Sequence, residues 1–407
     1  MSNIDVLVVG GGPAGASLAF ALARSGVDVR VVDRARFPRP KPCAEYLSPE
    51  ASRILADMGA LELIEQTGAA ALAGIHVRAP NGNVIKGDFI ASHGFRGFRD
   101  RGLSVRRETL DAILLDRARS AGADIVEGMR VTGIVRGNTD RVVGVQTLVN
   151  GEHAEIRAPI VVGADGLRSV IARRLGLAQT QRWPRRLALV THYANVRDVG
   201  EHGEMHVERD GYVGIADVGN GLTTVALVVP ASRSSEISAD RAAFLHRWLV
   251  SKPHLAPRFT GAERATPVVA TGPFASHARR AWAPGAALVG DAADFFDPFT
   301  GEGIYSALRG GEMLAAAIRS ALDASSERGI DAAFADYDRA RKQEFGGKWL
   351  VEKVIGAVVG TVPLINRAAK SLSARKDLAD LLIGVTGDFV PAREIIRLGY
   401  VWSVFGF

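Results

Sequence analysis

The sequence has little of the material that would cross-link it or carry it through a membrane. Its one cysteine, Cys43, excludes a disulfide within the chain and fits a reducing compartment. The start, Met1–Asp5, lacks the basic segment of a signal peptide. The longest uncharged apolar run near the C-terminus, 355–365, contains Pro363 and falls far short of the ~20 residues that span a bilayer. We therefore expect a cytoplasmic protein.

Several catalytic and binding signatures are also missing. No Gly-x-Ser-x-Gly, P-loop or CxxC motif occurs. The segment Glu201–His206 contains residue types that bind metals, but no further ligand is clustered with them, so we interpret it as a surface strand and predict no metal site. Because a second glycine fingerprint is absent, NAD(P)H would have to bind without a Rossmann domain of its own.

The net charge of +6 is unevenly distributed. Between Arg341 and Lys376 there are eight basic residues and only two acidic ones, Glu344 and Glu352. Three interpretations remain open: a solvated helix face, contact with an anionic membrane or lipid-like substrate, and nucleic-acid binding. No interleaving of aromatic and basic residues supports the last. We predict no nucleic-acid partner and keep a peripheral membrane contact through this basic C-terminal region as a hypothesis.

The N-terminal part has the pattern of a dinucleotide-binding βαβ unit. The apolar run 6–9 predicts a buried parallel strand that leads into Gly10-x-Gly12-x-x-Gly15 and an alanine-rich helix. Gly10 permits a tight turn, and Gly12 lets the backbone approach a pyrophosphate. Gly15 lets the helix pack closely on the strand. Asp33 ends the second predicted strand, where an acidic side chain binds a ribose diol.

The loop after Asp33 is extended and cationic. It carries Arg34 and Lys41 among four basic residues, together with three closely spaced prolines, and its cations are candidates for phosphate contact. Cys43 has two interpretations: a small buried hydrophobe, or a side chain that faces the cofactor and substrate. Tyr46 follows three residues later.

Two later segments end a buried strand in an acidic turn with glycine. Asp165, in Gly163-Ala164-Asp165-Gly166, is either a helix cap or a second cofactor ligand. Gly290-Asp291 ends the strand at 286–289, and Pro298-x-x-Gly301-x-Gly303 then leads into an alanine-rich helix. Glycines at that helix start let backbone N–H groups approach an oxygen, and the helix dipole stabilises negative charge there.

The remaining pattern predicts further elements. Residues 75–90 alternate as a hairpin with a turn at 80–83, and 124–135 reads as a single strand. A helix is expected to open at Leu103 and to carry Arg107 toward phosphate or ribose. From Phe334 onward we predict helices, interrupted at Gly346, Gly347, Gly356, Gly360, Pro363 and Gly384.

Together, the three glycine motifs resemble those of the flavoprotein superfamily that has the para-hydroxybenzoate hydroxylase fold. The resemblance spans roughly residues 4 to 320. It implies bound FAD, with its ADP half at the first turn, the ribityl chain at Asp291, and the isoalloxazine above Gly301 and Gly303. The predicted cofactor-binding residues are Gly10, Gly12, Pro13, Ala14, Gly15, Asp33, Arg34, Lys41, Cys43, Ala44, Arg107, Asp165, Gly290, Asp291, Pro298, Gly301, Glu302, Gly303 and Ile304.

Within this superfamily the chain is most similar to the geranylgeranyl reductase-like branch. Lys41-Pro42-Cys43-Ala44-Glu45 resembles that branch's Lys-x-Cys-Gly loop, although Ala44 replaces the glycine. Asp294 and Tyr305 stand where aromatic hydroxylases usually carry histidine and asparagine. The tryptophan-isoleucine-proline signature of halogenases is absent. By this resemblance, Cys43 and Tyr46 are the candidate catalytic residues, for proton supply or positioning.

The resemblance implies an α/β fold with three parts. A Rossmann-type, glutathione reductase-like FAD-binding domain is expected at 1–75, 103–182 and 272–325. An inserted mixed β-sheet substrate domain is expected at 76–102 and 183–271, and a helical C-terminal region at 326–407.

Three functions follow as hypotheses. The first is an FAD-dependent reductase that transfers hydride to a C=C bond of a lipophilic small molecule, with NAD(P)H open as external reductant. The second is a monooxygenase that hydroxylates an aromatic or polyketide substrate through a flavin C4a-hydroperoxide. The third is a non-catalytic, flavin-bound, membrane-associated protein. The sequence indicates neither the substrate nor the oligomeric state.

Overall fold

A parallel β-sheet forms the centre of the N-terminal half. The computed structural model describes residues 4–180, 185–274, 276–295, 297–324 and 326–406. Five of the six strands run parallel, and the short edge strand β21 runs antiparallel to β22. In order across the sheet the strands are β21 (Trp282–Ala283), β22 (Ala286–Leu288), β12 (Ile160–Gly163), β1 (Val6–Val9), β2 (Val29–Asp33) and β8 (Asp124–Glu127).

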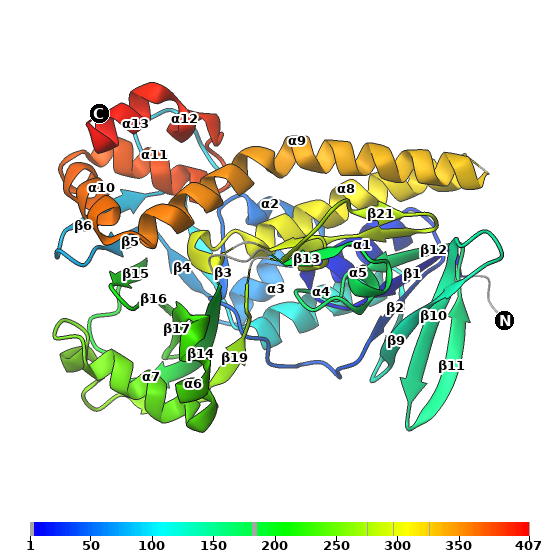
Figure 1. Cartoon of the computed structure of the whole chain (residues 1–407), viewed down its shortest axis with the longest axis horizontal. Helices are drawn as coiled ribbons and strands as arrows, with labels where there is room; N and C mark the ends of the chain where they lie inside the picture. The colour runs from blue at the N-terminus through cyan, green and yellow to red at the C-terminus, as the bar shows by residue number, and fades with distance from the viewer. Residues whose placement is uncertain (1–3, 181–184, 275, 296, 325, 407) are drawn as a thin grey trace.

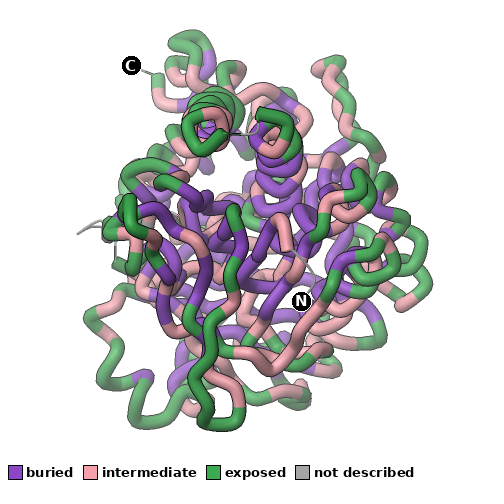
Figure 2. The backbone as a smooth tube through the Cα atoms, turned by 90° about the vertical axis from the view of Figure 1, so that its right-hand side faces the viewer, coloured by how far each residue is buried: buried purple, intermediate pink, exposed green. Residues whose placement is uncertain are grey.

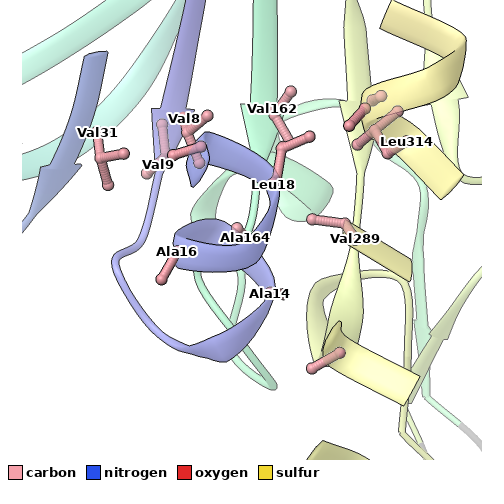
Figure 3. Packing of buried hydrophobic residues seen from close by; sticks show 14 of the residues in the cluster. Val8, Val9, Ala14, Ala16, Leu18, Val31, Val162, Ala164, Val289 and Leu314 are labelled. Carbon is pink, nitrogen blue, oxygen red and sulfur yellow. The ribbon is translucent and has the colours of Figure 1, made fainter. Parts of the chain in front are cut away.

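Helices and a β-meander pack around this sheet (Figure 1). The central helix α1 (Pro13–Ala23) contacts both α4 (Arg107–Ser120) and α8 (Gly303–Asp323). The antiparallel strands β9 (Arg130–Arg136), β10 (Val142–Val149) and β11 (Glu152–Arg157) pack against β2 and β12. Figure 3 shows Leu18 of α1 beside Val8 and Val162, so the glycine turn stands on a close-packed core.

A second, larger sheet has eight strands. Its strand order is β18-β14-β17-β16-β15-β5-β6, and β19 also pairs with β14. Helices α6 (Ser234–Ala239) and α7 (Arg241–Val250) adjoin one side of it, and C-terminal helices adjoin the other (Figure 1). The strands are β5 (Gly74–Arg78), β6 (Val84–Asp88), β14 (Arg186–Ala194), β15 (His202–Glu208), β16 (Gly211–Asp217), β17 (Leu222–Pro230), β18 (Glu263–Arg264) and β19 (Val269–Thr271).

Two three-stranded sheets and five short helices connect these parts. One sheet has the order β3-β7-β4 and the other β13-β20-β23. Their strands are β3 (Tyr46–Leu47), β7 (Gly102–Ser104), β4 (Ala70–Leu72), β13 (Ala178–Thr180), β20 (Ser276–Ala278) and β23 (Asp294–Phe295). The short helices in this part are α2 (Ala51–Asp57), α3 (Leu61–Gln66), α5 (Val170–Arg174), and the 3-10 turns η3 (Gly290–Ala292) and η4 (Pro298–Thr300).

The C-terminal region is helical, as predicted, but with different breaks. Helix α9 (Glu327–Val359) runs unbroken through Gly346, Gly347 and Gly356, so the breaks predicted there are wrong. Each interior glycine costs a helix only about 1 kcal/mol relative to alanine, and α9 regains this by packing Phe334 and Phe345 into the core. The chain does turn at Gly360. The helices that follow are α10 (Val362–Ala374), α11 (Lys376–Thr386), α12 (Arg393–Ile396) and α13 (Leu398–Phe405).

Other local predictions are partly right. The hairpin at 75–90 is confirmed as β5 and β6, joined by a turn at 80–83. The helix predicted from Leu103 starts only at Arg107, because 102–104 pair as β7 between β3 and β4. The single strand predicted at 124–135 is two strands, because the chain turns at Gly128 with a positive φ of 79°.

Burial is concentrated in the sheets and their helix contacts (Figure 2). Strand β15 is part of this interior rather than a surface strand, as its residues are half-buried or buried. Among the described residues, no one helix has both the length and the apolar character to cross a bilayer; α9 and α10 meet that test only as a pair bent by 107°.

Candidate functional site

The three glycine turns, far apart in sequence, meet at the carboxyl end of the parallel sheet. A Cβ at Gly10 would lie 2.4 Å from the carbonyl oxygen of Ala164, so the first turn touches the second. A Cβ at Gly290 would lie 2.8 Å from the Cβ of Ala14, so the third turn touches the start of α1. Gly15 packs even more tightly than these two, since its Cβ would meet the Gly10 oxygen at 1.9 Å.

Gly12 differs from its neighbours because a Cβ there would meet no atom closer than 3.6 Å. The nearest atoms to a Cβ there are guanidinium nitrogens, Nη2 of Arg39 at 3.6 Å and Nη2 of Arg107 at 4.0 Å. Both arginines share one carboxylate. Arg107 binds Asp111 through two hydrogen bonds of 2.7 and 2.8 Å, and Arg39 lies 3.1 Å from it. Two buried cations on one anion leave a positive charge beside the open face of the turn.

Asp33 lies at the end of β2, as predicted, and hydrogen-bonds to the turn. Its Oδ2 accepts from the N–H of Gly11 at 2.8 Å, and its Oδ1 accepts from the N–H of Ala35 at 2.8 Å. Each oxygen keeps a further lone pair for a ribose hydroxyl. The next residue, Arg34, is exposed to solvent.

The Asp165 carboxylate caps the short helix α5. Its Oδ2 accepts from the N–H of Val170 at 2.6 Å, which supports the helix-cap alternative for this residue. Its Oδ1 is buried without a hydrogen-bond partner. Lys41 lies alongside, with Nζ 3.4 Å from the position of a Cβ on Gly166.

Lys41 and Asp291 lie close enough for their charges to interact. Burial lowers the pKa of Lys41, Asp291 opposes that shift, and Arg107 adds to it. Burial likewise raises the pKa of Asp291, and both Lys41 and Arg107 act in the opposite direction. The charged side chains of the cationic loop and of the third glycine turn therefore stabilise each other.

Cys43 lies in a loop held by a strained glutamate. Glu45 has a positive φ of 64°; its Oε1 accepts from the N–H of Arg107 at 2.9 Å, and its Oε2 lies 2.7 Å from Nε2 of His192 on β14. The Cys43 sulfur accepts from the N–H of Glu45 at 3.3 Å. Burial raises the pKa of the thiol, although Arg107 opposes the shift. Neighbouring Ala44 packs with the apolar cluster under the larger sheet.

Tyr46 contacts the third motif directly. A Cβ on Gly301, whose φ is +74°, would lie 2.7 Å from Cδ1 of the Tyr46 ring. The phenol donates to the carbonyl oxygen of Thr386 at 3.3 Å. Burial, with Asp388 and Glu302 nearby, raises the pKa of this phenol well above its usual value, so it is a neutral hydrogen-bond donor.

The segment between η4 and α8 forms the mouth of the helix. Pro298 opens η4, which is capped by Asp297, and Gly303 begins α8 opposite the ring of Phe295. Ile304 is buried in the first turn. Glu302 is also buried, and its two carboxyl oxygens have no hydrogen-bond partner.

Asp294 and Tyr305, the two residues that differ from the hydroxylase pattern, both contact helix α9. Asp294 forms an ion pair with Arg341 of α9. Tyr305 has Nζ of Lys348 above its ring, 4.1 Å from the centroid. A pocket between this segment, α8 and α9 is lined by Asp297, Glu302 and Glu352, among others.

Comparison with known proteins defines the class. The family described as "FAD binding domain" matches residues 3–344. The chain therefore belongs to the FAD-binding domain family and is an FAD-dependent oxidoreductase.

Curated relatives include two kinds of reductase. A menaquinone reductase of Mycobacterium tuberculosis (strain ATCC 25618 / H37Rv) is 32% identical over 332 residues, which cover 77% of this chain and 76% of the relative. A digeranylgeranylglycerophospholipid reductase of Methanosarcina acetivorans is 29% identical over 325 residues, covering 78% of this chain and 75% of the relative.

Solved structures share the fold. The flavin-dependent brominase Bmp2 superposes with a TM-score of 0.83 at 22% identity, covering 98% of this chain and 97% of that one. The flavin-dependent halogenase CmlS gives a TM-score of 0.75 at 27% identity, covering 85% of this chain but 63% of that one. A geranylgeranyl bacteriochlorophyll reductase-like protein of Thermoplasma acidophilum gives 0.73 at 22% identity, covering 99% of this chain and 95% of that one.

The groove fits the cofactor of this family. The open face of Gly12 and the excess positive charge of Arg39 and Arg107 suit a pyrophosphate. Asp33 retains acceptor capacity for a ribose, and Asp291 lies at the other end of the groove, beside the third turn. The individual cofactor contacts of these residues remain predictions.

Several residues of the site were not predicted. They include Asp111, His192, Lys348, Asp388 and Glu352. Asp111 lies one helical turn after Arg107, a spacing that could have indicated an ion pair. His192 and Asp388 had no such signal, because they reach Glu45 and Lys348 only through the tertiary fold.

Proposed function

We propose that this protein is an FAD-dependent reductase that adds hydride and a proton to a C=C bond of a lipophilic small molecule. The observation that carries the proposal is the loop 41–47, which holds a protonated thiol, Cys43, and a neutral phenol, Tyr46, whose ring packs on Gly301, a glycine that we assign to the ring site. The reductase names among its relatives support the same reaction class.

When bound, FAD supplies hydride chemistry, and the chain supplies binding and protons. The N–H groups at the start of α1 and the two arginines bind the pyrophosphate. Tyr46 packs on Gly301 and so fixes the floor of the ring site. Cys43 holds a proton at Sγ, and Glu45 positions that sulfur through its backbone N–H.

An apolar surround favours a lipophilic substrate. Ala44, Phe299 and Tyr212 belong to or pack on one hydrophobic cluster under the larger sheet, and that cluster continues into α10 and α11. The substrate would enter between sheet and helices, where burial of apolar chain contributes about 25 cal/mol per Å².

The test is anaerobic. Flavin in the purified protein is reduced photochemically, and prenyl or quinone-like alkenes are then added. We expect the flavin to reoxidise as the alkene is reduced, and C43A to slow this reoxidation at least tenfold with FAD still bound. Reoxidation only by oxygen, with ¹⁸O entering an aromatic product, would instead establish the hydroxylase alternative. A protein that binds no FAD would overturn both.

A further inference from the structure

Four ionisable side chains meet behind the first turn of α8. Glu302 precedes this helix, Lys348 and Glu352 project from α9 one turn apart, and Asp388 follows α11. Lys348 forms an ion pair with Asp388, whose side chain is fully buried. Glu302 and Glu352 line the same pocket. None of these groups has a role in the function proposed above.

Glu302 lies where an ionised carboxylate would be costly. The residue is only 2% exposed, and both Oε1 and Oε2 are buried without a hydrogen-bond partner. Asp388 differs, because its Oδ1 forms an ion pair with Lys348, although its Oδ2 is also buried without a hydrogen-bond partner. A buried carboxylate with no donor loses its hydration and gains nothing in return, so Glu302 is stable there only as the neutral acid.

The charge balance of the cluster agrees. Three carboxyl groups share one ammonium group, and Asp388 already neutralises it. The other groups facing the cluster do not add a free cation: Asp297 is paired with Arg186, Tyr46 and Tyr305 are neutral phenols, and Glu50 and Lys353 contribute only weakly. Burial raises the pKa of both Glu302 and Glu352. Two protons are therefore retained near neutral pH.

The pocket provides a route for exchange. Glu352 is partly exposed, whereas Glu302 is enclosed, and both line the space between the 290–303 segment and α9. Glu302 is flanked in the chain by Gly301 and Gly303, the glycines at the mouth of α8 that we assign to the ring site, and Gly303 lines the same pocket. Both acids thus line the pocket, Glu302 next to the glycines of that site and Glu352 with its side chain partly in water.

We propose that Glu302 and Glu352 form a proton store that supplies the redox site from the pocket. This inference rests on the proposed function only for the place of the redox site. When a C=C bond takes up hydride and the proton of the Cys43 thiol, the O–H bond of Glu302 breaks and its proton replaces the one that Cys43 has given. Glu352 then protonates the Glu302 carboxylate, and water in the pocket protonates Glu352. The electrons come from a nicotinamide nucleotide, and none passes through the carboxyls.

Infrared spectroscopy tests the store itself. At pH 7.5 ordinary carboxyls, with pKa values near 4, are ionised, so a C=O band of a protonated acid reports a retained proton. We expect such a band in the purified protein and the loss of the part due to Glu302 in E302Q, while the part due to Glu352 remains; E152Q, which changes an exposed glutamate of β11, should keep the whole band. An E302Q spectrum that keeps the whole band would overturn the proposal, whether or not the protein binds FAD.

Exchange kinetics test the route. Transfer into D₂O shifts the band of Glu302, and we expect E352Q to keep this band but to slow its shift at least tenfold. An unchanged rate would remove Glu352 from the proposal. Circular dichroism and urea denaturation of each variant establish that it is folded before the spectra are compared.

Proton uptake links the store to the redox site. In the FAD-loaded protein, photoreduction is followed with a pH indicator, and we expect E302Q to change the pH dependence of protons taken up per electron pair, with E152Q unchanged. If E302Q behaves as the parent while alkenes still reoxidise the flavin, the store is wrong and the proposed reductase stands. If alkenes do not reoxidise the flavin but the infrared results are as expected, the proton store stands and the proposed reductase is wrong.

Discussion

Gly12 and Gly15 stand three residues apart in one turn, yet the fold needs them for different reasons. A side chain at Gly15 would run into the Gly10 carbonyl at 1.9 Å, so this glycine is required for α1 to lie on β1. Gly12 has φ −75° and ψ −174°, a conformation open to any residue, and its Cβ would meet nothing closer than 3.6 Å. Neither the backbone conformation nor the packing therefore requires glycine here, whereas a ligand bound beside the turn would.

The substitution Gly12→Ala therefore separates cofactor binding from folding. We expect the variant to unfold at the same urea concentration as the parent without cofactor, but to bind FAD at least tenfold more weakly, since the methyl group occupies the space between the turn and the arginines. Fluorescence titration with FAD measures this. Gly200→Ala, at an open position on the surface, serves as the control. Equal FAD affinity of G12A and the parent would contradict a pyrophosphate at this turn.

The reactivity of Cys43 provides a second prediction at this scale. Because burial raises the pKa of its thiol, the thiolate fraction at pH 7.5 is smaller than in an unfolded chain. We expect iodoacetamide to alkylate the folded protein at least tenfold more slowly than the protein in urea, and the rate to climb as pH rises beyond 8.5, the ordinary thiol value. Alkylation faster than in urea would show that Arg107 outweighs burial and stabilises a thiolate.

The role of a single residue could be predicted where it depends on the neighbouring sequence. The glycines of the three turns could be identified because backbone approach and left-handed φ leave a direct mark on sequence. Asp33 follows from its distance to the fingerprint. Glu45 and His192 could not be paired beforehand, since 147 residues separate them and neither belongs to a repeating pattern. The same applies to Glu302, whose neutrality depends on which helices bury it.

At the scale of elements, tertiary packing decided where helices end. Gly384 lies inside α11 and does not end the helix. A Cβ there would lie 2.4 Å from Cγ2 of Val390, so this glycine makes room for the segment that follows the helix. Gly346, inside α9, has no atom within 4 Å of its Cβ position. It contributes only the flexibility of glycine to the unfolded chain.

These two glycines predict opposite effects of alanine. We expect Gly346→Ala to increase the free energy of unfolding by about 0.5–1 kcal/mol, because alanine favours the helix and nothing obstructs its methyl group. Gly384→Ala is expected to lower it, because Val390 must shift. Urea denaturation of both variants measures the difference. A destabilised G346A would mean that α9 is kinked or covered at that point.

Across the whole molecule, distant segments complete one site. The helix α4, the strand β14 and the C-terminal helix α11 all contribute groups around loop 41–47. Sequence pattern predicted the βαβ unit well, because its elements are consecutive. It could not predict the pairing of β5 with β15, whose strands lie more than a hundred residues apart, nor the helices that close the ring end.

In the folded molecule, the basic residues between Arg341 and Lys376 are mostly paired with carboxylates. Five of these eight basic residues form ion pairs with carboxylates outside this window, so little of the local +6 remains unpaired. These pairs are Arg341–Asp294, Lys342–Asp338, Lys348–Asp388, Arg375–Asp377 and Lys376–Asp380. The most exposed apolar side chains of the C-terminal part lie on α13, where Leu398 is 88% and Trp402 65% exposed, one helical turn apart; within the window itself, Leu350 and Val354 of α9 are 47% and 49% exposed.

A membrane contact, if the protein makes one, should then depend on α13 more than on charge. We expect the parent to co-sediment with anionic vesicles, and the double variant L398S/W402S to lose most of this binding, while K342Q/K370Q keeps it. Because burial of apolar surface is insensitive to ionic screening, 0.5 M salt should weaken the parent's binding only slightly. If salt abolishes vesicle binding and the α13 variant still binds, the basic window makes the membrane contact instead. No co-sedimentation at low salt would exclude the membrane hypothesis for both surfaces.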